Sequence, residues 1–127
     1  MSTLMELTEK VNCYVGMFLP GKTYGEFVAL VYGFDIARDQ KPLEGFKEWL
    51  VLKFGKGNNL TWGALALLGL RIVLPSFVAG PAQLHIEAIA GLTSLISEFT
   101  KDREEKGIDE ILDNHKNWLH RQDWYKG

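Results

Sequence analysis

Apolar residues recur along the chain at the spacing of one helix face. Residues Thr23 to Glu26 have the sequence of a capping box, in which the threonine hydroxyl and the glutamate carboxylate bond amides at a helix start. Apolar residues then follow three and four positions apart, at Phe27, Leu30, Val31 and Phe34. This pattern predicts a helix from Thr23 to about Gln40, because Pro42 disfavours helical geometry at the residue before it.

Similar patterns predict further helices on both sides of this one. They cover residues 4–11, 43–54, 60–74 and 81–106, and a last helix starts at Asp109. The segment from Leu60 to Leu74 is apolar nearly all round, which predicts that it forms the central helix of the fold. Between Val11 and Leu19, apolar residues occupy alternate positions, a pattern typical of a short strand or an extended arm.

These elements predict an all-α fold: a bundle of about five helices in a single domain over residues 1–127, with a short extended element near the N-terminus. The length of 127 residues, with 46% hydrophobic and 24% charged residues, is that of one ordinary globular domain. The single cysteine, Cys13, excludes an internal disulfide and a cysteine-rich zinc site.

The charge balance and the apolar segments argue against nucleic acid and membrane as partners. A formal net charge of −2 argues against a dedicated binder of nucleic acid or of an anionic membrane. Residues Met1 to Glu6 lack the basic and apolar regions of a signal peptide. The apolar stretch from Leu60 to Gly80 contains Arg71 and Pro75, which favours a buried helix and a turn over a membrane span. We therefore expect a cytoplasmic protein that binds neither nucleic acid nor membrane.

One segment matches a phosphate-binding motif. The pattern G-x-x-x-x-G-K-[ST] is met by Gly16, Gly21, Lys22 and Thr23. In such a loop, backbone amides surround the phosphates, the lysine reaches the outer phosphates and the hydroxyl binds magnesium. The four middle residues are bulky, however, and the predicted helices provide no parallel sheet for a nucleotide-binding core. Nucleotide binding is therefore the alternative interpretation.

Residues with the spacing of a catalytic or metal-binding site do not stand out. His115 and His120 are five residues apart on one predicted helix, so their side chains point about 140° away from each other and cannot share a metal. The serines lack the G-x-S-x-G motif of a nucleophile elbow. We predict no catalytic residue, no metal and no cofactor.

The placement of charge is more informative than its total. Residues 1–97 contain 8 acids and 8 bases, whereas the segment from Glu98 to Asp113 contains 7 acids and 3 bases. Such a segment is either a solvated corner between two helices or a surface that attracts a basic protein partner, with an aromatic residue as anchor. The predicted partner-binding residues are Glu98, Asp102, Glu104, Glu105, Asp109, Glu110, Asp113 and Trp124.

Four short motifs in the first half of the chain carry a family resemblance. They are GMFL from Gly16, GFDIA from Gly33, GFxxWL from Gly45 and GNNLTW from Gly57. Through them, about the first 65 residues resemble a group of small bacterial proteins. Small acidic cytosolic proteins of this kind resemble immunity proteins, which neutralise a toxin domain by binding it. The resemblance implies a protein partner such as a toxin domain.

Three hypotheses about the function follow from these observations. The leading hypothesis is a non-enzymatic protein-binding protein of the immunity type, and the second is a nucleotide-binding protein that uses the Gly16 to Thr23 segment. The third is a helical domain with a small-ligand pocket, which requires motif residues from separate helices to converge. The residues predicted to form that pocket are Asp35, Trp49, Asn58, Asn59 and Trp62.

Overall fold

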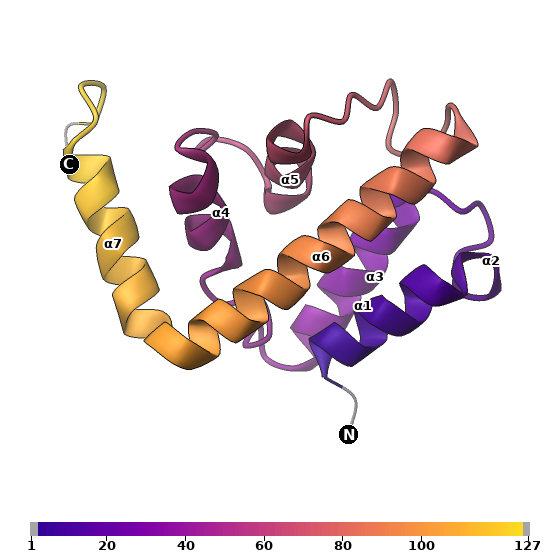
Figure 1. The fold of residues 1–127 in the computed structure, drawn as a ribbon, viewed down its shortest axis with the longest axis horizontal. Coiled ribbons are helices and arrows are strands. Elements are labelled where there is room, and N and C mark those ends of the chain that lie inside the picture. The colour runs from indigo at the N-terminus through magenta and orange to yellow at the C-terminus, as the bar shows by residue number, and fades with distance from the viewer. Residues whose placement is uncertain (1–2, 126–127) are drawn as a thin grey trace.

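Seven helices and no strand make up the part of the chain that the computed structural model describes, residues 3–125 (Figure 1). In chain order they are α1 (Leu4–Cys13), α2 (Val15–Phe18), α3 (Tyr24–Ala37), α4 (Phe46–Phe54), α5 (Trp62–Leu70), α6 (Ala82–Lys106) and α7 (Ile108–His120). The predicted all-α fold class is thereby confirmed, with seven helices in place of about five. Within residues 3–125, no helix combines the length and the apolarity that crossing a membrane requires.

The longest helix, α6, runs through the middle of the molecule and contacts α1, α3, α4, α5 and α7 (Figure 1). Its buried side chains include Ala88, Leu92, Leu95, Ile96 and Phe99. The Phe99 ring lies 5.1 Å from that of Phe46 and 5.7 Å from that of Trp49, between ring centroids. Edge and tilted ring contacts of this kind hold α4 against α6.

The prediction of α5 as the central helix is wrong. This helix spans nine residues rather than the predicted Leu60 to Leu74, and it ends at Arg71, whose backbone is left-handed with φ 60°. Several faces of α5 are apolar because it contacts both α4 and α6, and its Trp62 also packs on Tyr32 of α3. The residues after it form a connector, in which Ile72, Leu74 and Phe77 pack against the core.

The extended element predicted between Val11 and Leu19 is also wrong, because these residues lie mostly in α1 and α2. Val11 is fully buried as part of the core face of α1, whereas Met17 is 79% exposed, so the alternating apolar positions do not share one buried face. A lone strand here would leave backbone amides and carbonyls without partners, and a helix satisfies them locally.

The connector from residue 72 to 81 is held against the start of α3 by hydrogen bonds. Gly25 N–H donates to Phe77 O at 2.8 Å, and the Tyr24 and Phe77 rings meet edge to face at 5.2 Å. The buried His85 side chain joins both segments: Tyr24 N–H donates to His85 Nδ1 at 2.9 Å, and His85 Nε2 donates to Ala79 O at 2.8 Å. These two bonds fix the ring with its proton on Nε2.

The chain turns sharply between α6 and α7. Gly107 makes this turn with φ 86° and ψ 153°, a conformation that residues with a Cβ atom rarely adopt. Beyond it, α7 leaves the direction of α6 and packs mainly on α4, with Ile111 buried (Figure 1). An open space bounded by α4, α6 and α7 results.

Candidate functional site

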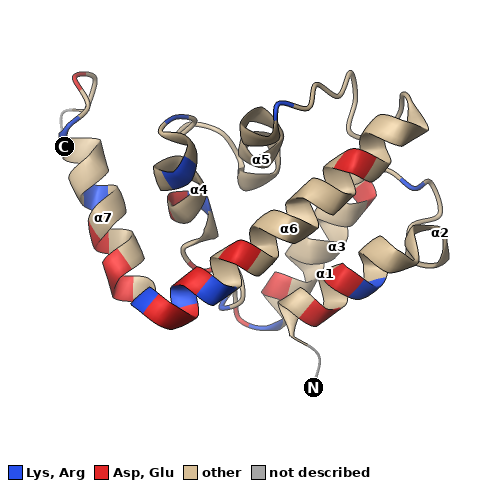
Figure 2. Ribbon diagram, viewed as in Figure 1, with Lys and Arg blue, Asp and Glu red and all other residues tan. Residues whose placement is uncertain are grey.

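Acidic residues gather along the chain where α6 meets α7 (Figure 2). Five of them are exposed and lie farther than 4 Å from any basic side chain in the described part of the chain. We call this group the acidic corner; its members are Glu104, Glu105, Asp109, Glu110 and Asp113. The other two predicted acids differ, because Glu98 pairs with Lys53 at 2.8 Å and Asp102 pairs with Lys106 at 3.2 Å.

Two of the three bases in the same segment are bonded within the protein, to groups outside the acidic corner. Arg103 Nη1 donates to the backbone carbonyls of Lys41 and Glu44, both at 3.0 Å, and its guanidinium lies 4.7 Å from the centroid of the Phe99 ring. Burial lowers the pKa of the Arg103 guanidinium, and the charges of Glu44, Glu104 and Asp35 oppose this effect. Lys106 is engaged with Asp102. The five carboxylates of the acidic corner therefore face solvent, and none of them forms an ion pair with a basic side chain of residues 3–125.

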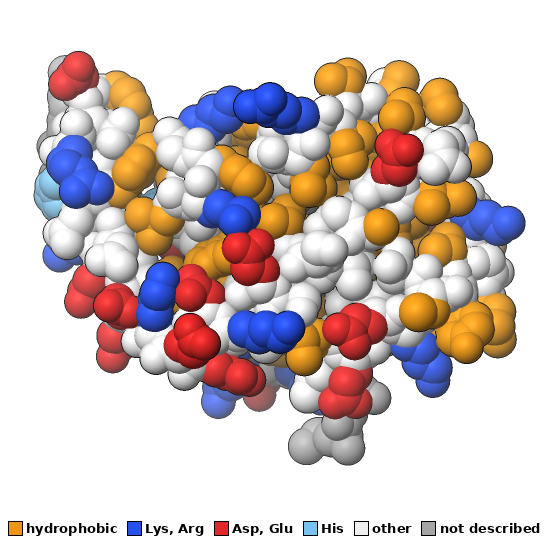
Figure 3. All heavy atoms as spheres, in the orientation of Figure 1, with side chains coloured by type: hydrophobic (Ala, Val, Ile, Leu, Met, Phe, Trp, Pro, Cys, Tyr) orange, Lys and Arg blue, Asp and Glu red, His pale blue; other side chains and the backbone are white. Residues whose placement is uncertain are grey.

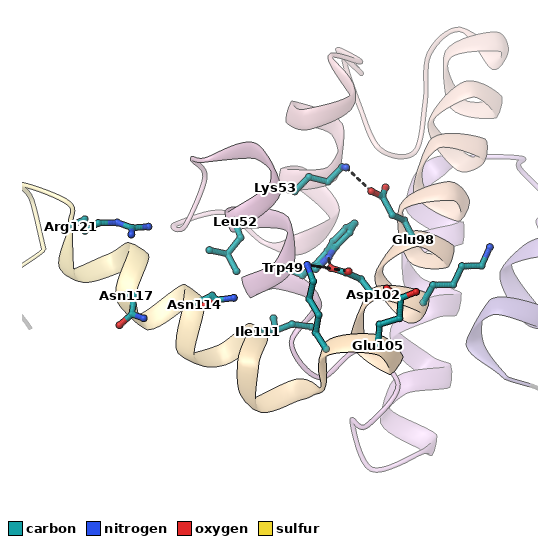
Figure 4. Close-up of a pocket in the computed structure, with 12 residues that line it drawn as sticks. Trp49, Leu52, Lys53, Glu98, Asp102, Glu105, Ile111, Asn114, Asn117 and Arg121 are labelled. Atoms are coloured by element: carbon teal, nitrogen blue, oxygen red, sulfur yellow. Dashed lines mark hydrogen bonds and ion pairs between the residues drawn. The ribbon is translucent and has the colours of Figure 1, made fainter.

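A groove of about 730 Å³ lies beside the acidic corner, between α4, α6 and α7 (Figure 4). Its lining residues are Trp49, Leu52 and Lys53 from α4, Glu98, Lys101, Asp102, Glu105 and Lys106 from α6, and Ile111, Asn114, Asn117 and Arg121 from α7 and its C-terminal end. In the space-filling view this face shows apolar and charged side chains next to one another (Figure 3). The lining of the groove therefore combines apolar side chains with charged ones.

Bonds across the groove join α4 to α6. The Trp49 indole Nε1 donates to Asp102 Oδ2 at 2.8 Å, and Lys53 Nζ donates to Glu98 Oε1 at 2.8 Å (Figure 4). The Trp49 hydrogen bond is the largest cause that lowers the pKa of the Asp102 carboxyl, followed among the lowering causes by the hydrogen bond from Lys106. Glu98 and Asp102 thus have structural partners, whereas the five acids of the acidic corner have no such partner in residues 3–125.

The segment that matches the phosphate-loop pattern binds a carboxylate of its own chain. Gly21 N–H donates to Glu26 Oε2 at 3.0 Å, and the Thr23 amide and hydroxyl both donate to Glu26 Oε1 at 3.0 Å. These bonds confirm the predicted capping box, and they lower the pKa of the Glu26 carboxyl. Gly16 belongs to α2, and Lys22 has φ 53°. Glu26 therefore occupies the Gly21 and Thr23 amides and the Thr23 hydroxyl, which are among the donors that a nucleotide would use.

The predicted ligand-pocket residues serve separate structural contacts. Asp35 is buried, and its Oδ1 accepts from Leu43 N–H at 2.9 Å, which closes the turn after α3. Trp49 and Trp62 both pack on the Phe46 ring, with centroids 6.3 and 5.7 Å apart. The structure therefore gives these three residues core and turn roles rather than one shared ligand site.

Asn58 and Asn59, by contrast, line a second cavity, of about 310 Å³, at the far end of α7 from the acidic corner. We call it the aromatic cleft; its lining residues are Gly55, Lys56, Gly57, Asn58, Asn59, Trp118, Gln122 and Trp124. The 13 residues of α7 span about 20 Å. The structure thus separates Trp124 from the acidic corner, whereas they are predicted from the sequence to share one surface.

Sequence reasoning missed Trp118 and Gln122 as members of the aromatic cleft. Trp118 and Gln122 follow His115 by three and seven residues, the spacing of one helix face. This spacing is the sequence signal that groups the two residues with His115. Within residues 3–125, no group of three or more His, Cys, Asp or Glu side chains has the arrangement of a metal site. Comparisons with protein-family models, with curated proteins and with solved structures find no match for this chain.

Proposed function

We propose that the protein is a non-enzymatic protein-binding protein that neutralises a toxin domain by covering it, in the manner of an immunity protein. The observation that supports this proposal most strongly is the acidic corner. Its five carboxylates face solvent, while Arg103 and Lys106 are engaged with other parts of the protein. A concentrated patch of one charge attracts a partner of opposite charge over a distance and raises the association rate. The partner is therefore a protein with a basic surface.

Apolar surface for a stable contact lies next to these carboxylates. Leu112 is 38% exposed on α7, one residue before Asp113 and three after Asp109. The neighbouring groove adds Leu52, which is half-buried, among its lining residues. Protein interfaces commonly combine a small apolar centre with a polar rim, and the centre supplies most of the binding energy. The acidic corner and the groove together provide the polar rim and the apolar centre of such an interface.

The proposal is tested by capture of the partner from the native host with the tagged protein. The variant Glu104→Lys, Glu105→Lys, Glu110→Lys reverses three charges of the acidic corner. The matched control, Glu6→Lys, Glu9→Lys, Glu87→Lys, reverses three exposed acids on α1 and on the first half of α6. Each reversal adds two charges, so both variants change the formal net charge from −2 to +4. Both also remove one acid from a first helical turn, Glu110 and Glu6 respectively, which costs about 0.5 kcal/mol in each case.

We expect the parent and the control variant to retain a stoichiometric partner at low salt, and high salt or the corner variant to release it. Retention by the corner variant, or a parent protein with no stoichiometric partner, would contradict the proposal. Co-expression with the captured partner then tests the immunity role. The parent is expected to restore the growth of cells that produce the partner, and the corner variant is not. A partner that does not impair growth would limit the function to protein binding.

A further inference from the structure

The aromatic cleft has the chemistry of a ligand site that is separate from the acidic corner. One wall is the loop from Gly55 to Asn59, and the other is the last turn of α7 with the residues that follow it. The rings of Trp118 and Trp124 meet at 6.2 Å between centroids with an interplanar angle of 65°. Trp124 is 59% exposed, so an indole of this cleft presents apolar surface to water.

Hydrogen bonds within the protein orient two of the three amide side chains of this cleft, those of Asn58 and Gln122. His115 Nε2 donates to Asn58 Oδ1 at 2.9 Å, and the His115 ring stacks on Trp118 with centroids 6.2 Å apart. This bond uses the Asn58 carbonyl and leaves its amide hydrogens as donors. Gln122 Nε2 donates to Trp118 O at 2.9 Å, which leaves Gln122 Oε1 as an acceptor. The cleft thus presents at least one fixed donor group and one fixed acceptor beside the two indoles.

The charges that line the cleft narrow the class of ligand. Lys56 is the one charged residue among the eight that line it, and it is exposed. The absence of an acid from this lining disfavours a cationic ligand, and a single exposed lysine is a weak site for a phosphate. Three side-chain amides, those of Asn58, Asn59 and Gln122, disfavour a wholly apolar ligand, because it would cover their remaining donor and acceptor groups without bonding them.

We propose that the aromatic cleft binds an uncharged sugar ring. A pyranose has an apolar C–H face that covers an indole ring and removes its surface from water. Its hydroxyl groups both donate and accept, which matches amides that offer both kinds of group. Binding sites of this kind combine aromatic surface with a few placed polar groups, and the volume of about 310 Å³ suits a ligand of one ring.

The test is an NMR titration of the purified protein with the methyl glycosides of glucose, galactose and N-acetylglucosamine. The four tryptophans give four indole N–H signals, which single Trp→Phe variants assign. We expect at least one sugar to shift the signals of Trp118 and Trp124 together with the side-chain amide signal of Asn59. Trp49 and Trp62 contact Phe46 in the core, and their signals are expected to stay in place.

Two variants and two further probes make the result decisive. Trp124→Ala is expected to weaken sugar binding about tenfold, as loss of a stacking ring does. The control Tyr14→Ala removes another aromatic side chain, 57% exposed on a different part of the surface, and is expected to leave affinity unchanged. Glycerol has hydroxyls without a ring face, and tetramethylammonium binds aromatic rings without hydroxyls. The proposal is overturned if no sugar shifts the cleft signals, if either probe shifts them as strongly, or if Trp124→Ala leaves sugar affinity unchanged.

Discussion

Two glycines of α3 have opposite surroundings, which makes their replacement by alanine a direct test of how the connector is packed. A Cβ atom at Gly25 would lie 2.8 Å from Phe77 O and 3.2 Å from Phe77 C, so it would meet backbone. A Cβ atom at Gly33 would meet nothing within 4 Å. Both residues lie in the same helix, eight positions apart.

The expected changes in the free energy of unfolding, relative to the parent, have opposite signs. In an exposed helix interior, Gly→Ala stabilises by about 0.5–1 kcal/mol, and Gly33→Ala is expected to gain this amount. At Gly25 the added methyl forces the connector away and strains the Gly25 N–H to Phe77 O bond of 2.8 Å. Overpacking of this kind costs about 1–3 kcal/mol, of which the helix preference returns up to about 1 kcal/mol. Gly25→Ala is therefore expected to destabilise by about 1–2 kcal/mol.

Thermal and urea unfolding of the two variants beside the parent measure this difference. For a chain of this size, 1 kcal/mol corresponds to about 4 °C in Tm, so Gly25→Ala is expected to melt about 4–8 °C below the parent and Gly33→Ala about 2–4 °C above it. Equal stability of the two variants would refute the packing of the connector against the first turn of α3.

Further predictions concern other contacts of the fold. His85→Ala leaves Tyr24 N–H and Ala79 O without their partner, and it is expected to destabilise by about 2–4 kcal/mol in urea unfolding, whereas a loss below 1 kcal/mol would contradict the described bonds. The pKa of Glu26 is lowered, mainly by the Gly21 and Thr23 amides, so its contribution to stability is present above its ordinary pKa of 4.5 and declines as pH falls through the lowered value. Glu26→Gln is expected to flatten this part of the stability profile, and an unchanged profile would count against the capping geometry. Trp49→Phe removes the largest cause that lowers the pKa of Asp102, so the carboxyl is expected to titrate at higher pH by NMR than in the parent. The pKa of His115 is lowered from 6.5, mainly by burial, so stability is expected to fall as pH drops below 6.5 and to fall less in His115→Asn.

The parts of the fold that were predicted correctly depend on residues close in sequence. The capping box at Thr23 and the apolar stripe from Phe27 to Phe34 need a few neighbouring side chains, and both are present in α3. The role of α5 depends on which elements surround it, and an apolar composition fits both a central helix and one covered from two sides. The helical state of residues 11–19 likewise depends on the absence of a partner strand in residues 3–125.

Some features of the candidate site likewise depend on residues close in sequence, and others depend on residues that are far apart. The acidic corner follows from the density of acids between Glu98 and Asp113, because exposed residues close in sequence across one turn remain close in space. The inward direction of Arg103 depends on the backbone carbonyls of Lys41 and Glu44, about 60 residues away, and no local pattern indicates it. The aromatic cleft depends on the bond between Asn58 and His115, which the packing of α7 on α4 brings together.

The central claim is that the acidic corner attracts a basic protein partner, and the salt dependence of the association rate tests it most directly. The rate would be measured by stopped-flow fluorescence between the purified partner and the parent, the corner variant and the matched control variant. For the parent, a rate that falls steeply as ionic strength rises is expected, because salt screens the attraction. The corner variant is expected to associate slowly at all salt concentrations, and the control variant to follow the parent. Equal salt dependence in the corner variant and the parent would contradict the claim.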